Sequence, residues 1–390
     1  MFNLSSEQIN EQNAIHTTRE IHQQPAVWQE LVSDFFAQLE TYKGFLASIY
    51  EKHTNVRIIL TGAGTSAFVG DTLVPELTRQ NKHNVHFESI PTTDIVSNPT
   101  AYLQKDVPTI LVSFARSGNS PESVATVSLA QEIITDLYQI VITCNKEGQL
   151  AKNIQNDLNS MLMLMPEKAN DQSLAMTSSF SSMIIAAYAL FTADTFTETV
   201  AKQVISSAEQ FIETLGDKVD EVLAFDFERI VYLGSGLLAQ LSHEAALKML
   251  ELSGGQVVAI NESSLGFRHG PKSILNSQSA VVLFMSKDPY TRKYDMDILR
   301  ELAATNSNMK IVALTETNDE EVEKLANWVI PVNSVADLLL NDFHLAVVYV
   351  IFAQVLALKK SLQLGISPDN PSPSGAISRV VQGVIIHEHK

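Results

Sequence analysis

The sequence contains the same series of apolar segments twice, and this internal repeat limits the possible folds more than any other feature. IILTGAG begins at Ile58, and the similar segment IVYLGSG begins at Ile230, an offset of 172 residues. Two further pairs have an offset of 171 residues: TILVSF and AVVLFM, which begin at Thr109 and Ala280, and IVITCN and IVALTE, which begin at Ile140 and Ile311. A repeat of this kind indicates two copies of one structural domain.

Each copy alternates short apolar strands with helices. In the first copy we expect strands over 57–60, 85–89, 109–114 and 138–143, and helices over 65–80 and 121–134. This alternation is typical of an α/β fold with a doubly wound parallel sheet, flanked by helices, that binds ligands at the carboxyl ends of its strands. The expected organisation is an N-terminal helical arm over 1–53, tandem domains over 54–210 and 211–364, and a C-terminal tail over 365–390.

Charge and composition exclude several classes of partner. The net charge of −17 argues against nucleic acid and against an anionic membrane surface, since both require basic residues. The longest apolar run, Leu345–Leu358, is too short to span a bilayer and contains Gln354, so a core helix is expected. No secretory signal is visible at the N-terminus, and we expect a cytoplasmic protein. The single cysteine, Cys144, follows an apolar segment and is interpreted as a buried residue rather than a catalytic thiol.

The segment from Ile230 to Lys272 carries residues suited to proton transfer. A helix is predicted over 238–252, and Glu244, Lys248 and Glu251 project from one of its faces. This row of charges also fits an ordinary solvated ion-pair stripe. His269 follows in GFRHGP, between turn residues, which indicates an imidazole carried by a loop. A carboxylate and an imidazole are the pair required to move protons near neutral pH.

The first copy also carries a candidate anion site. The segment 113–120, SFARSGNS, leads directly into a helix, and Gly118 permits close approach of its backbone to a ligand. Thr65 and Ser66 begin the first helix of the same copy. Each of these hydroxyls alone could be only an N-cap, but two hydroxyl-rich helix starts at one sheet edge favour a shared phosphate. The second copy has KDPY over 287–290 instead, so one phosphate site per chain is expected.

These motifs resemble the paired sugar isomerase (SIS) domains, as in the isomerase half of glucosamine-6-phosphate synthase. The resemblance is carried by GAGTS, RSGNSPES, ALKMLE and FRHGP. Within the family the chain is most similar to the AgaS type, described as a galactosamine-6-phosphate deaminase/isomerase and formerly as a tagatose-6-phosphate ketose/aldose isomerase. That similarity covers nearly the whole chain and includes LAMTSS, PYTRKYD and SRVVQGVIIHEH. It implies two tandem SIS domains.

The resemblance assigns roles to individual residues. The residues that match or adjoin the phosphate-binding hydroxyls of the synthase are Thr65, Ser66, Ser117 and Ser120. Ala115 departs from the family serine, and Arg116 offers its charge instead. Glu251 matches the glutamate that moves a proton between C1 and C2, His269 matches the ring-opening histidine, and Lys248 matches the active-site lysine. Arg379 is the candidate for the lysine near the end of the synthase tail, and the remaining candidate substrate contacts are Ser113, Thr177 and Ser178.

The resemblance also implies a reaction. The expected activity converts galactosamine 6-phosphate to tagatose 6-phosphate and ammonia in amino-sugar catabolism, with no metal or redox cofactor. A ketose/aldose isomerase that does not release ammonia would use the same residues. A sugar-phosphate-binding regulator without activity is the third alternative, against which stand Glu251, His269 and the absence of a basic helix-turn-helix segment. The expected partners are a small sugar phosphate and at least one further copy of the chain, in a homodimer or higher homo-oligomer. Lys248 could also form a purely structural ion pair with Glu244.

Overall fold

A computed structural model describes the chain from residue 1 to residue 390, except for 82–83, 306, 335–337, 376, 382 and 390. The chain divides into two compact units, which are described separately. The first-sheet unit consists of Ala26–Asp171, Met176–Glu198 and Ser374–Lys390. The second-sheet unit consists of Met1–Pro25, Gln172–Ala175 and Thr199–Pro373. The domain borders expected from the sequence stay predictions.

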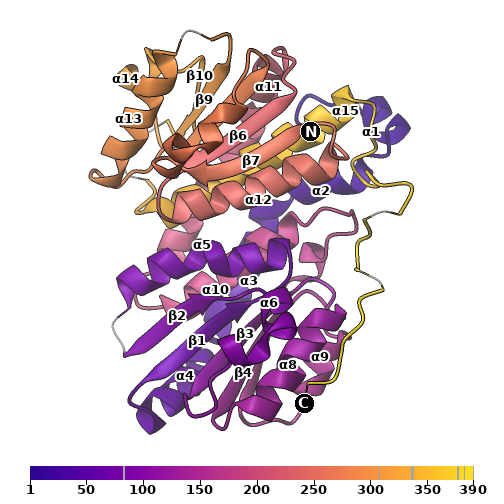
Figure 1. The fold of residues 1–390 in the computed structure, drawn as a ribbon, viewed down its shortest axis with the longest axis vertical. Coiled ribbons are helices and arrows are strands. Elements are labelled where there is room, and N and C mark those ends of the chain that lie inside the picture. Colours follow the sequence, from indigo (N-terminus) through magenta and orange to yellow (C-terminus); the bar gives the residue numbers. More distant parts are fainter. Residues whose placement is uncertain (82–83, 306, 335–337, 376, 382, 390) are drawn as a thin grey trace. The chain divides into compact units, whose positions relative to one another are not determined.

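The first-sheet unit is built on a five-stranded sheet in which every neighbouring pair of strands is parallel (Figure 1). Its strand order is β2-β1-β3-β4-β5. The strands are β1 (Val56–Thr61), β2 (Val85–Ser89), β3 (Thr109–Ala115), β4 (Leu137–Thr143) and β5 (Ser160–Leu164). β1 and β3 are buried along their whole length, and both therefore consist largely of apolar residues. The direction of winding reverses between β1 and β3, which is where sheets of this class bind ligands.

Helices cover both faces of this sheet. Ile59 of β1 and Leu111 of β3 pack against Val127 of α8 in one buried cluster. α5 and α10 contact the sheet and each other, and α3 joins them because the buried Trp28 donates a hydrogen bond to Ser181 at 2.9 Å. The helices of this unit are α3 (Gln24–Ala37), α4 (Leu39–Lys52), α5 (Thr65–Gln80), α6 (Thr92–Ser97), α7 (Pro99–Tyr102), α8 (Pro121–Ile133), α9 (Gln149–Asn153), η1 (Glu167–Ala169) and α10 (Ser178–Phe191).

The second-sheet unit repeats this architecture with its own five-stranded parallel sheet. Its order, read from the other edge, is β7-β6-β8-β9-β10, which is the order of the first sheet strand for strand. The strands are β6 (Arg229–Gly234), β7 (Val258–Ser263), β8 (Ser279–Phe284), β9 (Lys310–Thr315) and β10 (Trp328–Pro331). The predicted α/β fold with two parallel sheets is therefore confirmed.

The register of the two sheets corrects the offset of the repeat. Arg57 lies opposite Thr109 in the first sheet, and its equivalent, Arg229, lies opposite Ser279 in the second. Thr109 and Ser279 are 170 residues apart, whereas the similarity of the apolar segments gave 171. The equivalent loop residues after β3 and β8 are therefore also 170 apart, and Ser117 corresponds to Lys287.

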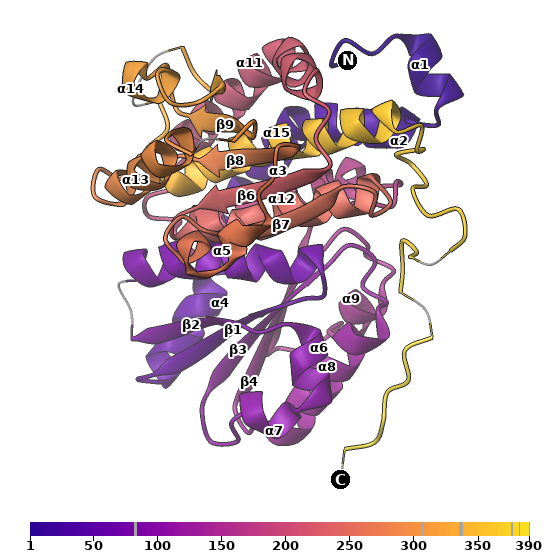
Figure 2. The same ribbon diagram turned by 45° about the horizontal axis from the view of Figure 1, so that its top comes forward.

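Helices of the second-sheet unit include the long apolar helix that the sequence predicts as a core element. α15 is long and apolar enough to cross a membrane, yet 94% of its most apolar window is buried inside the protein. It packs against α12 (Figure 2), and the prediction of a core helix is confirmed. The helices of this unit are α1 (Ser6–Glu11), α2 (Ile15–His22), α11 (Glu198–Leu223), α12 (Leu237–Leu252), η2 (Gly266–His269), η3 (Pro271–Ile274), α13 (Thr291–Ala303), α14 (Glu320–Glu323) and α15 (Asp342–Gln363).

Candidate active site

The turn between β1 and α5 places two hydroxyl groups at the carboxyl edge of the first sheet. Gly62 is required because a Cβ there would lie 2.5 Å from the carbonyl carbon of Ser66, and Gly64 has a φ of +56°. The N-cap of α5 is Gly64, so Thr65 and Ser66 lie in the first turn of the helix. The interpretation of these two residues as N-caps is therefore wrong. Both side chains are buried, and the Ser66 hydroxyl lies 3.8 Å from the sulfur of Met176.

The loop after β3 contributes the second group of hydroxyls. Ser120 occupies the N-cap position of α8, but its side chain makes no capping hydrogen bond. The Ser117 hydroxyl accepts a hydrogen bond from the backbone N–H of Asn119 at 3.3 Å. Gly118 has a φ of +68°, and the loop packs closely there, because a Cβ would lie 3.3 Å from the Cα of Gly148. Hydroxyl groups at a helix start that they do not cap suit an anionic ligand.

Topology brings these two groups to one edge of the sheet. β1 and β3 are parallel neighbours, and Thr61 lies opposite Ser113 at their carboxyl ends. Thr65 and Ser66 follow Thr61 by four and five residues, and Ser117 and Ser120 follow Ser113 by four and seven residues. Ser113 itself is buried at the end of β3. Thr65, Ser66, Ser117 and Ser120 therefore surround the switch point of the first sheet.

Arg116 and Arg379 add positive charge to this edge. The Arg116 side chain is buried, and it donates a hydrogen bond to the backbone oxygen of Arg379 at 2.8 Å. Arg379 is exposed and donates to the backbone oxygen of Asp171 at 2.9 Å and to Asn170 at 2.9 Å. The C-terminal tail thus reaches the loop that carries Arg116.

Thr177 and Ser178 stand at the start of α10, where their backbone N–H groups bind a carboxylate of the protein. The carboxylate of the buried Asp171 accepts hydrogen bonds from the backbone N–H groups of Thr177, Ser178 and Ser179 at 2.8, 3.1 and 2.9 Å. This carboxylate occupies the start of α10 in place of an external anion. The sequence analysis did not identify Asp171. The signal that could have identified it is a carboxylate that lies six to eight residues before a run of hydroxyl residues.

The cysteine lies at the end of β4 in the same unit. Cys144 is buried, and burial raises the pKa of its thiol, an effect to which the nearby Asp171 charge adds. A thiol held neutral in this way is a poor nucleophile. The interpretation of Cys144 as a buried structural residue is supported.

The predicted proton-transfer residues of the second-sheet unit lie on α12. Glu244 and Lys248 are both fully buried, with Lys248 Nζ 3.5 Å from Glu244 Oε1. Lys248 Nζ also donates a hydrogen bond to Glu251 Oε2. The Glu251 side chain keeps 22% of its surface exposed. A solvated ion-pair stripe is therefore excluded, because only Glu251 of the three reaches solvent. Glu251 is a partly accessible carboxylate held by a buried ammonium group.

His269 ends the short helix η2 after β7. Its side chain is exposed, and within the described part of the chain it makes no hydrogen bond or ion pair. The neighbouring Arg268 and Lys272 are instead paired with Glu301, at 2.5 and 2.6 Å. The sequence predicted an imidazole carried by a loop, whereas the structure places it at the end of a short 3-10 helix, with its side chain exposed. Its accessibility suits a role toward a bound molecule.

The turn of the second sheet that corresponds to the phosphate loop is filled by the protein's own carboxylates. Asp295 is fully buried and accepts hydrogen bonds from Ser235 at 2.5 Å, Ser264 at 2.6 Å and the Ser286 backbone at 2.9 Å. Asp342 accepts from the Ser286 hydroxyl at 2.5 Å and from the Lys287 backbone at 2.8 Å. Burial raises the pKa of Asp295, and these hydrogen bonds oppose the rise. Two internal carboxylates thus take the position of an external anion.

No group of three or more potential metal ligands is found among the described residues. Met176, whose sulfur faces Ser66, is the other site residue that sequence reasoning missed. It follows Ala175 in LAMTSS, and no charge or spacing sets it apart. The first-sheet unit thus carries a candidate anion site, and the second-sheet unit carries a carboxylate–ammonium pair and an accessible imidazole.

Comparison with known proteins defines the class to which this chain belongs. A family model described as SIS domain matches residues 49–193 and 225–362. The chain belongs to the SIS domain family.

Two relatives and one solved structure are similar over almost the full length. D-galactosamine-6-phosphate deaminase AgaS of Escherichia coli is 41% identical over 372 residues, which are 95% of this chain and 95% of that protein. The protein of the same name from Shewanella sp. (strain ANA-3) is 41% identical over 386 residues, covering 98% of this chain and 95% of the relative. The crystal structure of tagatose-6-phosphate ketose/aldose isomerase from Escherichia coli has a TM-score of 0.87 and 38% identity, covering 96% of this chain and 97% of that one.

Proposed function

We propose that this chain is a galactosamine-6-phosphate deaminase/isomerase, which converts galactosamine 6-phosphate and water to tagatose 6-phosphate and ammonia. The observation that carries the proposal is the 41% identity to D-galactosamine-6-phosphate deaminases across nearly the full length of both chains. The chain carries both groups that this activity needs: a candidate anion site on the first-sheet unit and a partly exposed carboxylate on the second-sheet unit. The proposed compartment is the cytoplasm, and the proposed pathway is the catabolism of N-acetylgalactosamine.

The proposed mechanism uses three side chains. His269 acts as acid and base on the ring oxygen and O1 to open the sugar ring. Glu251 takes the proton from C2 and returns it to C1, which passes through an enolamine and leaves a 2-imino ketose. Water then adds to the imine carbon and ammonia leaves, so C2 becomes the ketone. Lys248 holds the Glu251 carboxylate in position, which its burial and its hydrogen bond to Glu251 support.

Phosphate binding is assigned to the hydroxyl groups of the first sheet, namely Thr65, Ser66, Ser117 and Ser120, together with the charge of Arg116. The weaker candidates are Arg379, Ser113, Thr177 and Ser178. The backbone N–H groups of Thr177 and Ser178 already donate hydrogen bonds to Asp171. We also propose a homodimer or higher homo-oligomer. The exposure of His269 is consistent with an imidazole that acts on a substrate bound by the partner copy.

The substrate is tested with galactosamine 6-phosphate, glucosamine 6-phosphate and tagatose 6-phosphate, assayed side by side for ammonia and for ketose. Ammonia release from galactosamine 6-phosphate in equal amount to tagatose 6-phosphate is the expected result. A ketose/aldose isomerase is the second candidate, which the name of the similar crystal structure favours. Interconversion of tagatose 6-phosphate with an aldose, with no ammonia from any amino sugar, would establish that candidate and reject the deaminase.

The role of Glu251 is tested by Glu251→Gln, which keeps the shape of the side chain and removes its basicity. We expect kcat to fall by about 10²- to 10⁴-fold, the usual contribution of a general base, while the Kd for the sugar phosphate changes little. Glu209→Gln, at an exposed position on α11, is the control and should behave as the wild type. Turnover by Glu251→Gln within a few fold of the wild type would remove Glu251 from the mechanism.

A further inference from the structure

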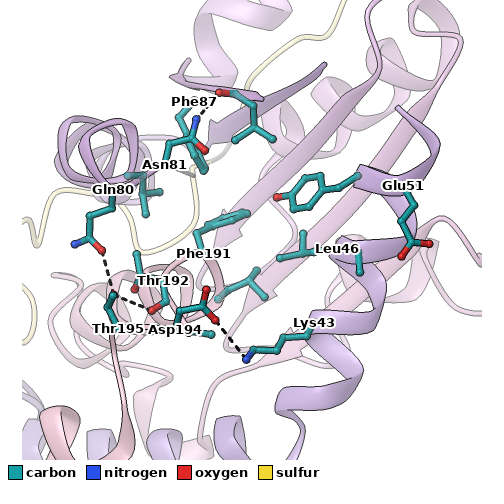
Figure 3. Close-up of a pocket in the computed structure, with 16 residues that line it drawn as sticks. Lys43, Leu46, Glu51, Gln80, Asn81, Phe87, Phe191, Thr192, Asp194 and Thr195 are labelled. Carbon is teal, nitrogen blue, oxygen red and sulfur yellow. Dashed lines mark hydrogen bonds and ion pairs between the residues drawn. The ribbon is translucent and has the colours of Figure 1, made fainter. Parts of the chain in front are cut away.

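The first-sheet unit contains a pocket with a volume of about 430 Å³ (Figure 3). It is lined by α4, the last turn of α5, the start of β2 and the segment that ends α10. Its lining is mostly apolar and includes Leu46, Leu77, Leu190 and three aromatic residues, Tyr50, Phe87 and Phe191. The volume is in the range typical of sites for small organic molecules.

This pocket is separate from the candidate phosphate site. α5 begins at the phosphate site with Thr65 and Ser66, and it reaches the pocket only at Leu77 and Gln80. A helix rises by about 1.5 Å per residue, so the two ends of α5 lie roughly 20 Å apart. Likewise, α10 begins beside Asp171 and meets the pocket at Leu190. A ligand in the pocket would therefore not touch the phosphate loop.

Aromatic side chains form much of the inner wall. The rings of Phe87 and Phe191 meet edge to face, with their centroids 5.2 Å apart. Tyr50 also lines the pocket, and burial raises the pKa of its hydroxyl. Rings packed edge to face leave faces and edges for a further ring, and such contacts add to the gain from apolar burial. The interior therefore suits a planar aromatic group.

The opening carries more negative than positive charge. Lys43 and Asp194 form an ion pair at 3.6 Å, with 43% and 68% of their side chains exposed. Glu51 stands apart from this pair at the rim, as Figure 3 shows, and among the described residues it has no hydrogen bond or ion pair. The two carboxylates and one ammonium group leave a net charge of about −1 at the opening. The net charge of the chain, −17, has the same sign.

From these observations we infer that the pocket is a second binding site, for a small molecule with one aromatic ring and a cationic amino group. The ring would enter between Tyr50, Phe87 and Phe191, and the ammonium group would pair with Glu51 at the rim. An aromatic carboxylate of the same size would be disfavoured, because it would meet Glu51 and Asp194.

The test uses 2-phenylethylamine as the probe on the full-length protein, with binding measured by isothermal titration calorimetry and ligand-observed NMR. We expect saturable binding with a Kd on the order of 1 mM, which is usual for a ligand of this size. 2-Phenylethanol should bind several fold more weakly, and phenylacetate more weakly still. Glu51→Gln should remove the preference for the amine over the alcohol, whereas Glu40→Gln, exposed elsewhere on α4, should preserve it.

A blocking pair of variants locates the site. Ala47→Trp fills the pocket from an exposed position on α4, and it should weaken amine binding by at least tenfold. Ser48→Trp adds the same ring at the adjacent exposed position, which does not line the pocket, and it should leave binding unchanged. Four results would each overturn the inference: no saturable binding, equal losses in both tryptophan variants, equal affinity for phenylacetate, or displacement by inorganic phosphate. A change of oligomeric state in Ala47→Trp, with no amine binding to the wild type, would identify the pocket as a contact between copies of the chain and would also overturn it.

Discussion

At the scale of single residues, the Ser120 hydroxyl could either cap α8 or bind the substrate phosphate, and the two roles can be tested separately. It stands at the N-cap of α8, yet its hydroxyl makes no capping hydrogen bond. Ser120→Ala should therefore change the free energy of unfolding by less than about 0.5 kcal/mol, below the usual value for a lost cap. If the hydroxyl binds the substrate phosphate, KM should rise by about tenfold, because a hydrogen bond to a charged group contributes about 1.5 kcal/mol. Steady-state kinetics and urea unfolding give the two values.

Ser128→Ala is the matched control on the same helix. The Ser128 hydroxyl bonds only to the backbone oxygen of Val124 within α8, at 3.2 Å, and its side chain is exposed. Neither KM nor stability should change in this variant. A loss of about 1 kcal/mol of stability in Ser120→Ala, with KM unchanged, would show that Ser120 is a cap and would remove it from the phosphate site.

The sequence does not show which individual side chains are buried. Glu244, Lys248 and Glu251 were correctly predicted to share a face of one helix, because that follows from 3.6 residues per turn. Whether the face meets solvent depends on what packs against α12, and its neighbour α15 is remote in sequence. The pattern of charges is the same in both cases. The structure therefore had to distinguish the buried Glu244–Lys248 pair from a solvated stripe.

At the scale of helices and strands, the number and order of elements were predictable, whereas the register was not. β3 and β8 are buried on both faces and consist largely of apolar residues, so they have no alternation that marks which side chains point to which face. The apolar segments at Thr109 and Ala280 look alike at an offset of 171, but the ladders align them at 170. The glycine turns were more informative, since Gly64 and Gly236 share φ values of +56° and +57° at an offset of 172.

The first turn of α15 contains a histidine that should make stability depend on pH. His344 is buried, and burial, assisted by the charge of Lys287, lowers its pKa to about 4. Folding favours the neutral ring, so its full contribution to stability is present above pH 6.5, the ordinary value, and is lost as the pH falls from 6.5 toward 4. Between pH 7.5 and pH 5.0 this loss should be about 2 kcal/mol.

The comparison with His344→Gln isolates this effect from the other titrating groups. The free energy of unfolding of both proteins is measured with urea at pH 7.5 and at pH 5.0. The loss on acidification in the wild type, minus the loss in the variant, is due to His344 alone. The wild type should lose about 2 kcal/mol more than the variant on acidification. Asp295 acts in the opposite direction, because its raised pKa favours the folded state as the pH falls, but it is present in both proteins and cancels. Equal losses in the two proteins would contradict the buried neutral ring.

At the scale of the whole molecule, two copies of one fold should provide a single anion site. In the second sheet the equivalent turn holds the carboxylates of Asp295 and Asp342, which accept hydrogen bonds from Ser286 and Lys287. An incoming phosphate would have to displace both carboxylates, and its charge would be repelled by theirs. In the first sheet the residues that correspond to Ser286 and Lys287 are Arg116 and Ser117. The two copies share the turn, and we expect only the copy without these carboxylates to bind an anion.

Titration with galactitol 6-phosphate, which lacks the C1 aldehyde and cannot react, tests this expectation by calorimetry. One molecule should bind per chain. Ser117→Asp adds to the first sheet the kind of charge that fills the second, and it should weaken binding by more than about 100-fold, since like charges placed side by side cost several kcal/mol. Ser206→Asp, which adds the same charge at an exposed position on α11, should leave the affinity and the stoichiometry unchanged. Binding of two molecules per chain, or of one molecule that survives Ser117→Asp, would mean that the second sheet binds phosphate despite its two carboxylates.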